Sequence, residues 1–368
     1  MKTTKIGILG LGTVGSGFVE LVQSQSRQIE ERCGVRLEIV AACVRNLEKY
    51  KERFPFPVTT DWREAVLPAD IIVEVMGGLQ DAEQAITSAL EHGKGVVTAN
   101  KALIATAGAD LLSLSETTGS PLRWEAAVGG GLPIIRVLGT YLRSQPIDRI
   151  DAVLNGTTNF MLGKMEQGAT YDQALAEAQA LGFAEADPTS DVDGWDTLYK
   201  TCILASMSWG QWVDPSQMTP TGIRGIEPWM MEIAAKEGAS IKLVGSASRL
   251  SDGKVRVQVG PTWIPQINPL ANLAGPENGV AIGTGTVGPL LIKGVGAGGH
   301  PTGSAVLADV IELAMLGSHA PFMGWKNERA LVGTSLEGQK SLALSKTQGI
   351  LKGDFKLPDD ATLLFDLS

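Results

Sequence analysis

The first 128 residues alternate between short apolar runs and longer stretches in which apolar residues recur at helical spacing. Residues 5–9 form an apolar run, and Val14, Phe18 and Leu21 then recur on one face of a predicted helix. The later runs that predict strands are 37–44, 70–76, 95–100 and 122–128, and the stretches that predict helices are 80–92 and 108–117. Strands that alternate with helices predict an α/β fold built on a doubly wound parallel sheet.

A glycine motif lies between the first predicted strand and the first predicted helix. Gly10 permits the tight turn, Gly12 lets the backbone approach a pyrophosphate, and Gly15 lets helix and strand pack closely. The helix start at Thr13 and Val14 offers backbone N–H groups and a positive dipole end to phosphates. The motif therefore predicts a dinucleotide site of Rossmann type; the alternative is a tight strand–helix turn without a ligand.

The strand over 37–44 is followed by Arg45, with Lys49 and Lys51 close behind. NAD-specific domains usually carry an acid at this point, where it holds the ribose hydroxyls, whereas a cation suits the 2′-phosphate of NADP. We therefore predict that NADP is preferred, that NAD is the other possible cofactor, and that Arg45 contacts it. The alternative is that Arg45 is a solvated surface charge.

Ligands of doubly wound sheets bind beyond the carboxyl ends of the strands. This rule places Gly77, Asn100, Lys101 and residues 129–131 around one crevice. We therefore expect these residues near the cofactor.

A second glycine-rich turn covers residues 294–303 and precedes an apolar helix predicted over 304–316. Gly298 and Gly303 belong to this turn, which can return the chain to the crevice and close over the nicotinamide. The alternative is a loop that crosses between domains without touching a ligand.

The segment from 170 to 200 carries the densest chemical signal. Five carboxylates fall within twelve of its residues, and Asp196 and Lys200 lie four apart, on one helix face. Residues 201–209 are almost wholly apolar, which predicts a buried helix, and buried charges are costly unless they are paired or used. We therefore favour a functional Asp196–Lys200 pair over a surface ion pair.

These groups suit a small zwitterion that carries a carbonyl group to be reduced. A carboxylate can bind a ligand ammonium, and a buried lysine with a lowered pKa can pass a proton near neutral pH. Asn155, Gly156 and Thr157 follow a strand predicted over 149–154 and form a polar turn that presents amides and hydroxyls, or a plain turn. The three histidines are scattered and suggest neither a catalytic triad nor a metal site.

Length and composition narrow the setting. The 368 residues predict two domains, and the net charge of −9 with no basic face argues against nucleic-acid binding. No apolar run is long enough to span a membrane, and the N-terminus does not have the pattern of a signal peptide. Cys33, Cys43 and Cys202 are too widely spaced for a metal or disulfide framework, so we expect reduced thiols and a cytoplasmic protein.

With these residues in view, the chain resembles homoserine dehydrogenases from residue 5 to about 315. The longest match is 178–200, AQALGFAEADPTSDVDGWDTLYK. The other segments that carry the resemblance are GLGTVG at 10–15, EVMGG at 74–78, TANKALIA at 98–105, EAAVGGGLPII at 125–135, NGTTNF at 155–160 and GAGGHPTGSAVLAD at 296–309.

The resemblance implies an oxidoreductase that reversibly reduces L-aspartate 4-semialdehyde to L-homoserine with NAD(P)H, in threonine, methionine and isoleucine biosynthesis. Glu185 and Asp196 would bind the substrate, and Lys200 would donate the proton to its carbonyl oxygen. Lys101 would be a second lysine at the reacting end. Which lysine transfers the proton stays open, and we favour Lys200 because Asp196 can orient it. The further expected substrate contacts are Asp191, Asn155, Gly156 and Thr157.

Cofactor and cation contacts are implied in the same way. Gly182 would touch the nicotinamide side. A monovalent cation, Na⁺ or K⁺, would bind backbone carbonyls around Glu125, Val128, Gly130 and Leu132. His300 stands where such proteins commonly carry Asp or Asn, which we expect to be a tolerated loop change.

We expect a dinucleotide-binding domain over 1–134, completed by roughly 303–368, and a mixed α/β substrate and dimerisation domain over 135–302. The family implies a homodimer or a dimer of dimers. The segment over 326–368 looks too short for a threonine-sensing domain, so we expect little threonine inhibition. Two other functions stay open: a dehydrogenase for another small amino-acid carbonyl, and a non-catalytic NAD(P) sensor.

Overall fold

The computed structural model describes residues 2–50, 52–333, 340–345, 349–352 and 361–367. The chain forms two compact units, each assembled from three segments. Unit 1 comprises Met1–Arg143, Ser206–Asp214 and Ala297–Arg329, and unit 2 comprises Ser144–Ala205, Pro215–Gly296 and Ala330–Ser368.

Unit 1 is built on a six-stranded parallel sheet with the order β3-β2-β1-β4-β5-β6. Its strands are β1 (Lys2–Leu9), β2 (Val35–Cys43), β3 (Val58–Thr59), β4 (Ile71–Glu74), β5 (Gly95–Thr98) and β6 (Leu122–Arg123). The chain reverses direction across the sheet between β1 and β4, which is where ligands of such folds bind. The predicted doubly wound sheet is confirmed.

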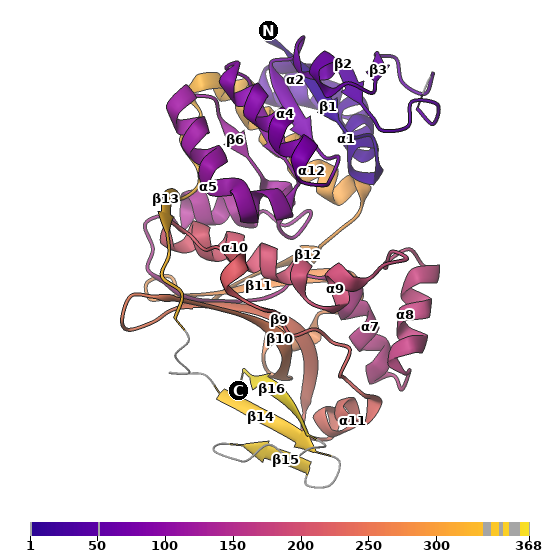
Figure 1. Ribbon diagram of the computed structural model, residues 1–368, viewed down its shortest axis with the longest axis vertical. Helices are drawn as coiled ribbons and strands as arrows, with labels where there is room; N and C mark the ends of the chain where they lie inside the picture. The colour runs from indigo at the N-terminus through magenta and orange to yellow at the C-terminus, as the bar shows by residue number, and fades with distance from the viewer. Residues whose placement is uncertain (1, 51, 334–339, 346–348, 353–360, 368) are drawn as a thin grey trace. The chain divides into compact units, whose positions relative to one another are not determined.

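Helices cover both faces of this sheet (Figure 1). They are α1 (Thr13–Ser24), α2 (Ser26–Cys33), α3 (Trp62–Val66), α4 (Gln80–Glu91), α5 (Lys101–Thr118), α6 (Ile134–Arg136) and α12 (Gly299–Leu316). On one face Ile6 and Ile8 of β1 share a buried core with Phe18 of α1 and with the apolar side of α12. On the other face Gly7 lies against α3, and α4 packs beside α5.

α1 and α12 come from opposite ends of unit 1 yet approach closely. A Cβ added at Gly303 would lie 2.8 Å from the Phe18 nitrogen, and one at Gly17 would lie 2.5 Å from the Gly299 carbonyl carbon. Only glycine fits at these crossing points, because any side chain would meet backbone that cannot move aside. Packing of the two helices therefore requires glycine at position 303.

Unit 2 is built on an eight-stranded sheet with the order β12-β11-β7-β9-β10-β16-β14-β15. Its strands are β7 (Ile147–Val153), β9 (Ala239–Arg249), β10 (Val255–Pro265), β11 (Glu277–Thr284), β12 (Leu290–Val295), β14 (Lys340–Ser345), β15 (Gly349–Lys352) and β16 (Ala361–Asp366). Its helices are α7 (Gly156–Glu166), α8 (Tyr171–Ala180), α9 (Thr189–Val192), α11 (Pro228–Lys236) and α10 (Trp195–Trp209), of which the residues from Ser206 on belong to unit 1. α10 packs on β9, where an added Cβ at Gly245 would overlap the Thr201 hydroxyl.

The end of the chain departs from the expected division. Residues 303–368 were expected to complete the first domain, but only the part up to Arg329 lies in unit 1. There β13 (Lys326–Arg329) pairs with β8 (Gln211–Trp212). β16 instead pairs in parallel with β10, and β14 pairs with β16, so the last strands extend the sheet of unit 2 (Figure 1). Backbone pairing with an existing sheet edge decides this, and local sequence does not encode it.

Two element boundaries also differ from the expected ones. α5 begins at Lys101 rather than near 108, because the Asn100 side chain accepts a hydrogen bond from the Leu103 amide and caps the helix. The apolar run 122–128 is a strand only over Leu122–Arg123, followed by a 3₁₀ turn over Glu125–Ala127. Among the described residues, no helix is long and apolar enough to cross a membrane.

Candidate active site

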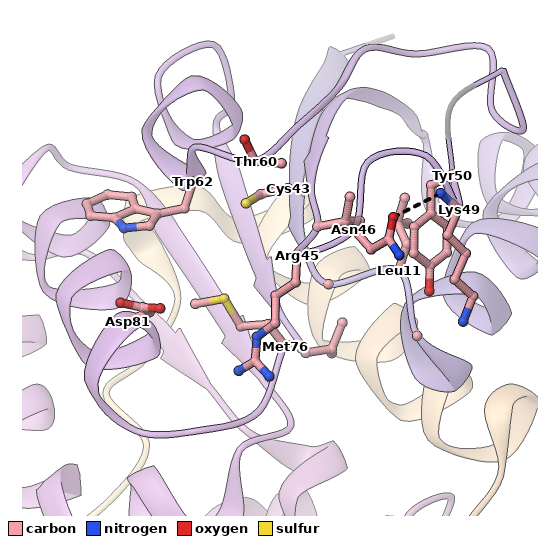
Figure 2. Close-up of a pocket in the computed structure, with 14 residues that line it drawn as sticks. Leu11, Cys43, Arg45, Asn46, Lys49, Tyr50, Thr60, Trp62, Met76 and Asp81 are labelled. Carbon is pink, nitrogen blue, oxygen red and sulfur yellow. Dashed lines mark hydrogen bonds between the residues drawn. The ribbon is translucent and has the colours of Figure 1, made fainter.

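A cavity of about 440 Å³ opens at the carboxyl ends of β1, β2 and β4 in unit 1 (Figure 2). Its wall includes the glycine turn after β1, the residues after β2 and the end of β4. The lining residues are Gly10, Leu11, Gly12, Cys43, Val44, Arg45, Asn46, Lys49, Tyr50, Thr60, Trp62, Val75, Met76 and Asp81. The cavity lies at carboxyl ends of the sheet strands, but Gly77, Asn100, Lys101 and residues 129–131, which we expected near the cofactor, are not among the residues that line it.

The glycine turn has the backbone geometry that the motif predicted. Gly10 has a φ of 106°, and a Cβ there would lie 2.7 Å from the Val75 carbonyl oxygen. A Cβ at Gly15 would lie 2.0 Å from the Gly10 oxygen, so helix and turn are in direct contact. Space is open beside Gly12, and no side chain caps the start of α1 at Thr13. The first amides of α1 therefore stay available to a phosphate.

Two cationic side chains, from residues that follow β2, line the cavity. The Arg45 guanidinium reaches to 3.5 Å from the position of a Cβ on Gly78, and the Lys49 ammonium lies 5.3 Å from the centre of the Tyr50 ring. Figure 2 shows Arg45 extending beside Met76. Lys51, which the sequence grouped with these cations, lies outside the described residues. The open turn, the helix start and the cations together fit a dinucleotide with phosphate groups.

The loops after β4 and β5 are tied together in unit 1. Gly77 has a φ of 68°, and the Asn100 side-chain amide donates to the Gly78 oxygen at 2.6 Å. Lys101 follows as the first residue of α5. Gly298, with a φ of 120°, precedes α12.

Four of the predicted site residues form one hydrogen-bonded cluster in unit 2. The Asn155 Nδ2 donates to Asp191 Oδ1 at 2.7 Å and to Asp196 Oδ2 at 2.9 Å. The Lys200 Nζ donates to Asp196 Oδ2 at 2.7 Å and to the Leu154 oxygen at 2.8 Å. The Asn155 oxygen accepts from the Thr158 amide and caps α7. The start of α7, the short helix α9 and the helix α10 therefore hold the cluster.

The cluster is shielded from water and contains more negative than positive charge. The side chains of Asp196 and Lys200 are 5% and 12% exposed. Burial raises the pKa of Asp191, the charge of Asp196 raises it further, and the Asn155 amide and the Lys200 charge act against that rise. Two carboxylates and one lysine are charged groups of this cluster, and a pair of neighbouring carboxylates suits a cationic group on a ligand.

The other predicted substrate residues lie near this cluster in sequence, but not all join it. The Thr157 hydroxyl donates to the Phe183 oxygen at 2.6 Å and so links α7 to the loop after α8. Gly182, with a φ of 76°, and Glu185 lie in that loop and are exposed. Among the described residues, no hydrogen bond joins the Glu185 carboxylate to the cluster. Gly156 is the first residue of α7.

The segment expected to bind a cation contains a carboxylate network that the sequence did not predict. The Glu125 carboxylate accepts the Ile135 and Arg136 amides at 2.8 Å each, and the Glu125 amide donates to Asp309. Burial raises the pKa of Glu125 to about 7, and that of Asp309 to about 6.

The backbone carbonyls in this segment already take part in turns. The Glu125 oxygen accepts from the Val128 amide at 3.4 Å, and the Leu132 oxygen accepts from the Ile134 amide at 2.9 Å. The next predicted ligand, Gly130, has a φ of 56°. No group of three His, Cys, Asp or Glu side chains in the described part of the chain could hold a metal ion.

Sequence reasoning also missed Glu74, the buried last residue of β4. Its Oε2 accepts from the Thr98 hydroxyl, and its Oε1 accepts from the Met76 amide. The signal was present, because a carboxylate inside the apolar run 70–76 is unusual for a buried strand.

The chain matches two family models. One is described as "Homoserine dehydrogenase, NAD binding domain" and covers residues 10–125, and the other as "Homoserine dehydrogenase" and covers 133–311.

Known proteins with these names are similar over most of their length. The homoserine dehydrogenase of Lactococcus lactis is 39% identical over 84% of this chain and 74% of its own. The homoserine dehydrogenase of Synechocystis is 42% identical over 84% of this chain and 73% of its own length. A homoserine dehydrogenase structure from Thiobacillus denitrificans superposes with a TM-score of 0.89 at 35% identity, over 93% of this chain and 82% of that one. A hyperthermophilic archaeal homoserine dehydrogenase in complex with NADPH superposes with a TM-score of 0.72 at 31% identity. The superposition covers 88% of this chain and 100% of that one.

Proposed function

The chain belongs to the homoserine dehydrogenase family, and on that premise we propose which of its residues carry out each part of the reaction. The protein is an NAD(P)-dependent oxidoreductase acting on a CH–OH group. The reaction is the reversible reduction of L-aspartate 4-semialdehyde to L-homoserine. The cavity at the glycine turn supports cofactor binding in unit 1, and the Asn155–Asp191–Asp196–Lys200 cluster supports substrate binding in unit 2.

Lys200 is the proton donor in this proposal. A bound reduced nicotinamide supplies hydride to the carbonyl carbon. The oxygen then gains negative charge and takes a proton from the Lys200 ammonium, which becomes a neutral amine. In the direction of homoserine oxidation the neutral amine takes the hydroxyl proton back. Lys101 is kept as the second lysine at the reacting end.

The observation that carries this assignment is the double contact of the Lys200 ammonium. Asp196 Oδ2 at 2.7 Å and the Leu154 oxygen at 2.8 Å fix the nitrogen from two sides. A proton donor held in one place contributes more to rate than a mobile one, because its geometry is set before the reaction begins.

Acidic groups then bind the substrate ammonium. Asp191 and Asp196 share the Asn155 amide and supply the negative charge, and Glu185 supplies a further carboxylate from the loop after α8. Gly156 and Thr157 are assigned as backbone and hydroxyl contacts on the same side. A small zwitterionic substrate fits this set, because its ammonium can pair with the buried carboxylates.

The cofactor contacts are assigned to the cavity wall, which includes Gly10, Gly12 and Arg45, and to residues outside that wall. Gly10, Gly12 and Gly15 form the pyrophosphate turn, with the amides of Thr13 and Val14 directed at the phosphates. Arg45 meets the 2′-phosphate of NADP, so NADP is preferred over NAD. The remaining assigned contacts are Gly77, Lys101, Gly182, Gly298 and Gly303.

Three further assignments complete the proposal. A monovalent cation, Na⁺ or K⁺, binds the carbonyls of Glu125, Val128, Gly130 and Leu132. The protein is a homodimer or a dimer of dimers, which light scattering would measure. It acts in the cytoplasm, in keeping with the wide spacing of its three cysteines, which suits no disulfide framework.

The first experiment follows absorbance at the reduced-nicotinamide band with L-homoserine and NADP, then NAD, at alkaline pH. Growth of the band with homoserine, and none with L-serine or L-threonine, supports the activity and the substrate together. A larger kcat/KM with NAD than with NADP would refute the cofactor preference. No growth with either cofactor, from folded protein that binds NADPH, would refute the substrate assignment and leave the cofactor site standing.

A further inference from the structure

Glu74 is a carboxylate in a place where an apolar side chain would be expected. It is fully buried at the end of β4, after three buried apolar residues. Burial is the largest influence on its pKa and raises it, while the Thr98 hydroxyl and the amides of Met76 and Gly77 act in the other direction. A buried carboxyl group costs desolvation energy that an apolar side chain at the same position would not. Stability alone therefore does not account for a glutamate here.

The contacts of Glu74 run through two neighbouring strand ends. Its Oε2 accepts from the Thr98 hydroxyl at 2.5 Å, at the end of β5, and its Oε1 accepts from the Met76 amide at 2.9 Å, in the loop after β4. The Thr98 oxygen in turn accepts from the Asn100 amide at 3.0 Å. Each hydroxyl and carboxylate position is thus set by its neighbour.

Asn100 closes the circuit. Its side-chain oxygen accepts from the Leu103 amide at 3.1 Å and caps α5, and its Nδ2 donates to the Gly78 oxygen at 2.6 Å. The circuit therefore leads from Glu74 to Thr98, to Asn100 and back to the loop over 76–78. It fixes that loop and the first turn of α5, which starts at Lys101, relative to each other.

Both segments held by the circuit belong to the cofactor side of the proposed function. Met76 lines the cofactor cavity, and Gly77 and Lys101 are assigned as cofactor contacts. We propose that Glu74 is a positioning residue for hydride transfer, which acts through Thr98 and Asn100 to hold the 76–78 loop and Lys101 in their places around the cofactor. This inference rests on the proposed function, because that function makes the two segments cofactor contacts.

The test uses Thr98, which touches the circuit but is not assigned to the cofactor or the substrate. Thr98→Val keeps the shape of the side chain and removes the hydroxyl that joins Glu74 to Asn100. Thr98→Ser keeps the hydroxyl. Thr4→Val is the matched control, because Thr4 is also a buried threonine of the same sheet, and its hydroxyl has no hydrogen-bond partner among the described residues.

We expect Thr98→Val to weaken NADPH binding about tenfold, measured by reduced-nicotinamide fluorescence. Its kcat should fall by about 10- to 100-fold, since a displacement of about 1 Å can lower a rate about 10²-fold. The KM for homoserine should stay within about twofold, and Thr98→Ser and Thr4→Val should both behave like the wild type. Glu74→Gln should shift kcat and the NADPH Kd in the same direction as Thr98→Val.

Two results would overturn the inference. One is a Thr98→Val protein that is folded at the assay temperature and keeps the wild-type NADPH affinity and kcat. The circuit would then have a structural role only. The other is an equal loss in Thr98→Val and Thr4→Val. Failure of the proposed function is a separate outcome: the wild type would then not oxidise homoserine, while the fluorescence measurement of NADPH binding would still decide whether the circuit positions the cofactor loops.

Discussion

Replacement of Lys200 tests the proposed proton donor most directly. Lys200→Ala removes the ammonium that lies 2.7 Å from Asp196 Oδ2 and 2.8 Å from the Leu154 oxygen. Loss of a positioned general acid commonly lowers kcat about 10²- to 10⁴-fold. This corresponds to about 3–5 kcal/mol of transition-state stabilisation, at about 1.4 kcal/mol for each factor of ten. We expect kcat to fall by that factor and the Kd for NADPH to stay near its wild-type value.

The structure also predicts a second effect of this variant. Without the lysine charge, Asp191 and Asp196 still share the Asn155 amide but lose the nearby positive charge of Lys200. The Lys200 charge is one of the influences that lower the pKa of Asp191, so its loss raises that pKa further. The acid limb of the pH profile of the remaining activity should therefore move to higher pH.

Lys200→Arg separates proton transfer from charge balance. An arginine keeps the positive charge beside Asp196, but its pKa, above about 12, prevents it from donating a proton at working pH. If proton transfer is the role, the KM for homoserine should be largely kept in Lys200→Arg while kcat stays low. Initial rates over a range of homoserine at saturating NADP would measure both. Recovery of kcat to within about tenfold of wild type in the arginine variant, or a wild-type kcat in Lys200→Ala, would refute the reasoning.

Three further predictions address unit 1. Arg45→Ala should raise the KM for NADPH by about tenfold or more and leave that for NADH nearly unchanged, since a bidentate cation–phosphate contact is lost; equal effects on both cofactors would contradict the assignment. Because burial raises the pKa of Glu125 from 4.5 to about 7, the native protein keeps a proton that the unfolded chain has released. Its free energy of unfolding should therefore fall by about 3 kcal/mol from pH 4.5 to pH 7, measured by urea unfolding, with a flatter dependence in Glu125→Gln. Gly303→Ala should lower the unfolding free energy by about 1–3 kcal/mol, because its Cβ would lie 2.8 Å from the Phe18 nitrogen. The control is Gly163→Ala in α7, which has open space around it and should be neutral or stabilising. Similar changes in unfolding temperature for both variants would show that the contact between α1 and α12 is not the cause.

Some features of this protein follow from short stretches of sequence. The glycine turn after β1 depends on residues that are neighbours in the chain, and its backbone geometry matches the motif. Asp196 and Lys200 share a helix face because they are four residues apart, and the apolar run after them indicated burial. Such features are local, so the periodicity of the chain and the residue types are enough to predict them.

Other features were decided by contacts between distant segments. Asn155 meets Asp191 and Asp196 across 36 and 41 residues, and this brings the predicted site residues together. The Glu125 amide donates to the Asp309 carboxylate across 184 residues. Glu125, which lies in the segment expected to bind a cation, thereby becomes part of a buried network. Glu74 reaches Thr98 only because β4 and β5 pair.

The last strands show the same division. Each has an apolar pattern of its own, but nothing in that pattern places β16 beside β10 rather than in unit 1. A strand finds its partner through backbone hydrogen bonds, which every residue except proline can make, so the pairing carries little sequence signature. Local sequence therefore determined the elements and the chemistry they carry, and the tertiary structure decided which of those groups act together, because burial and charge coupling arise only when distant segments pack.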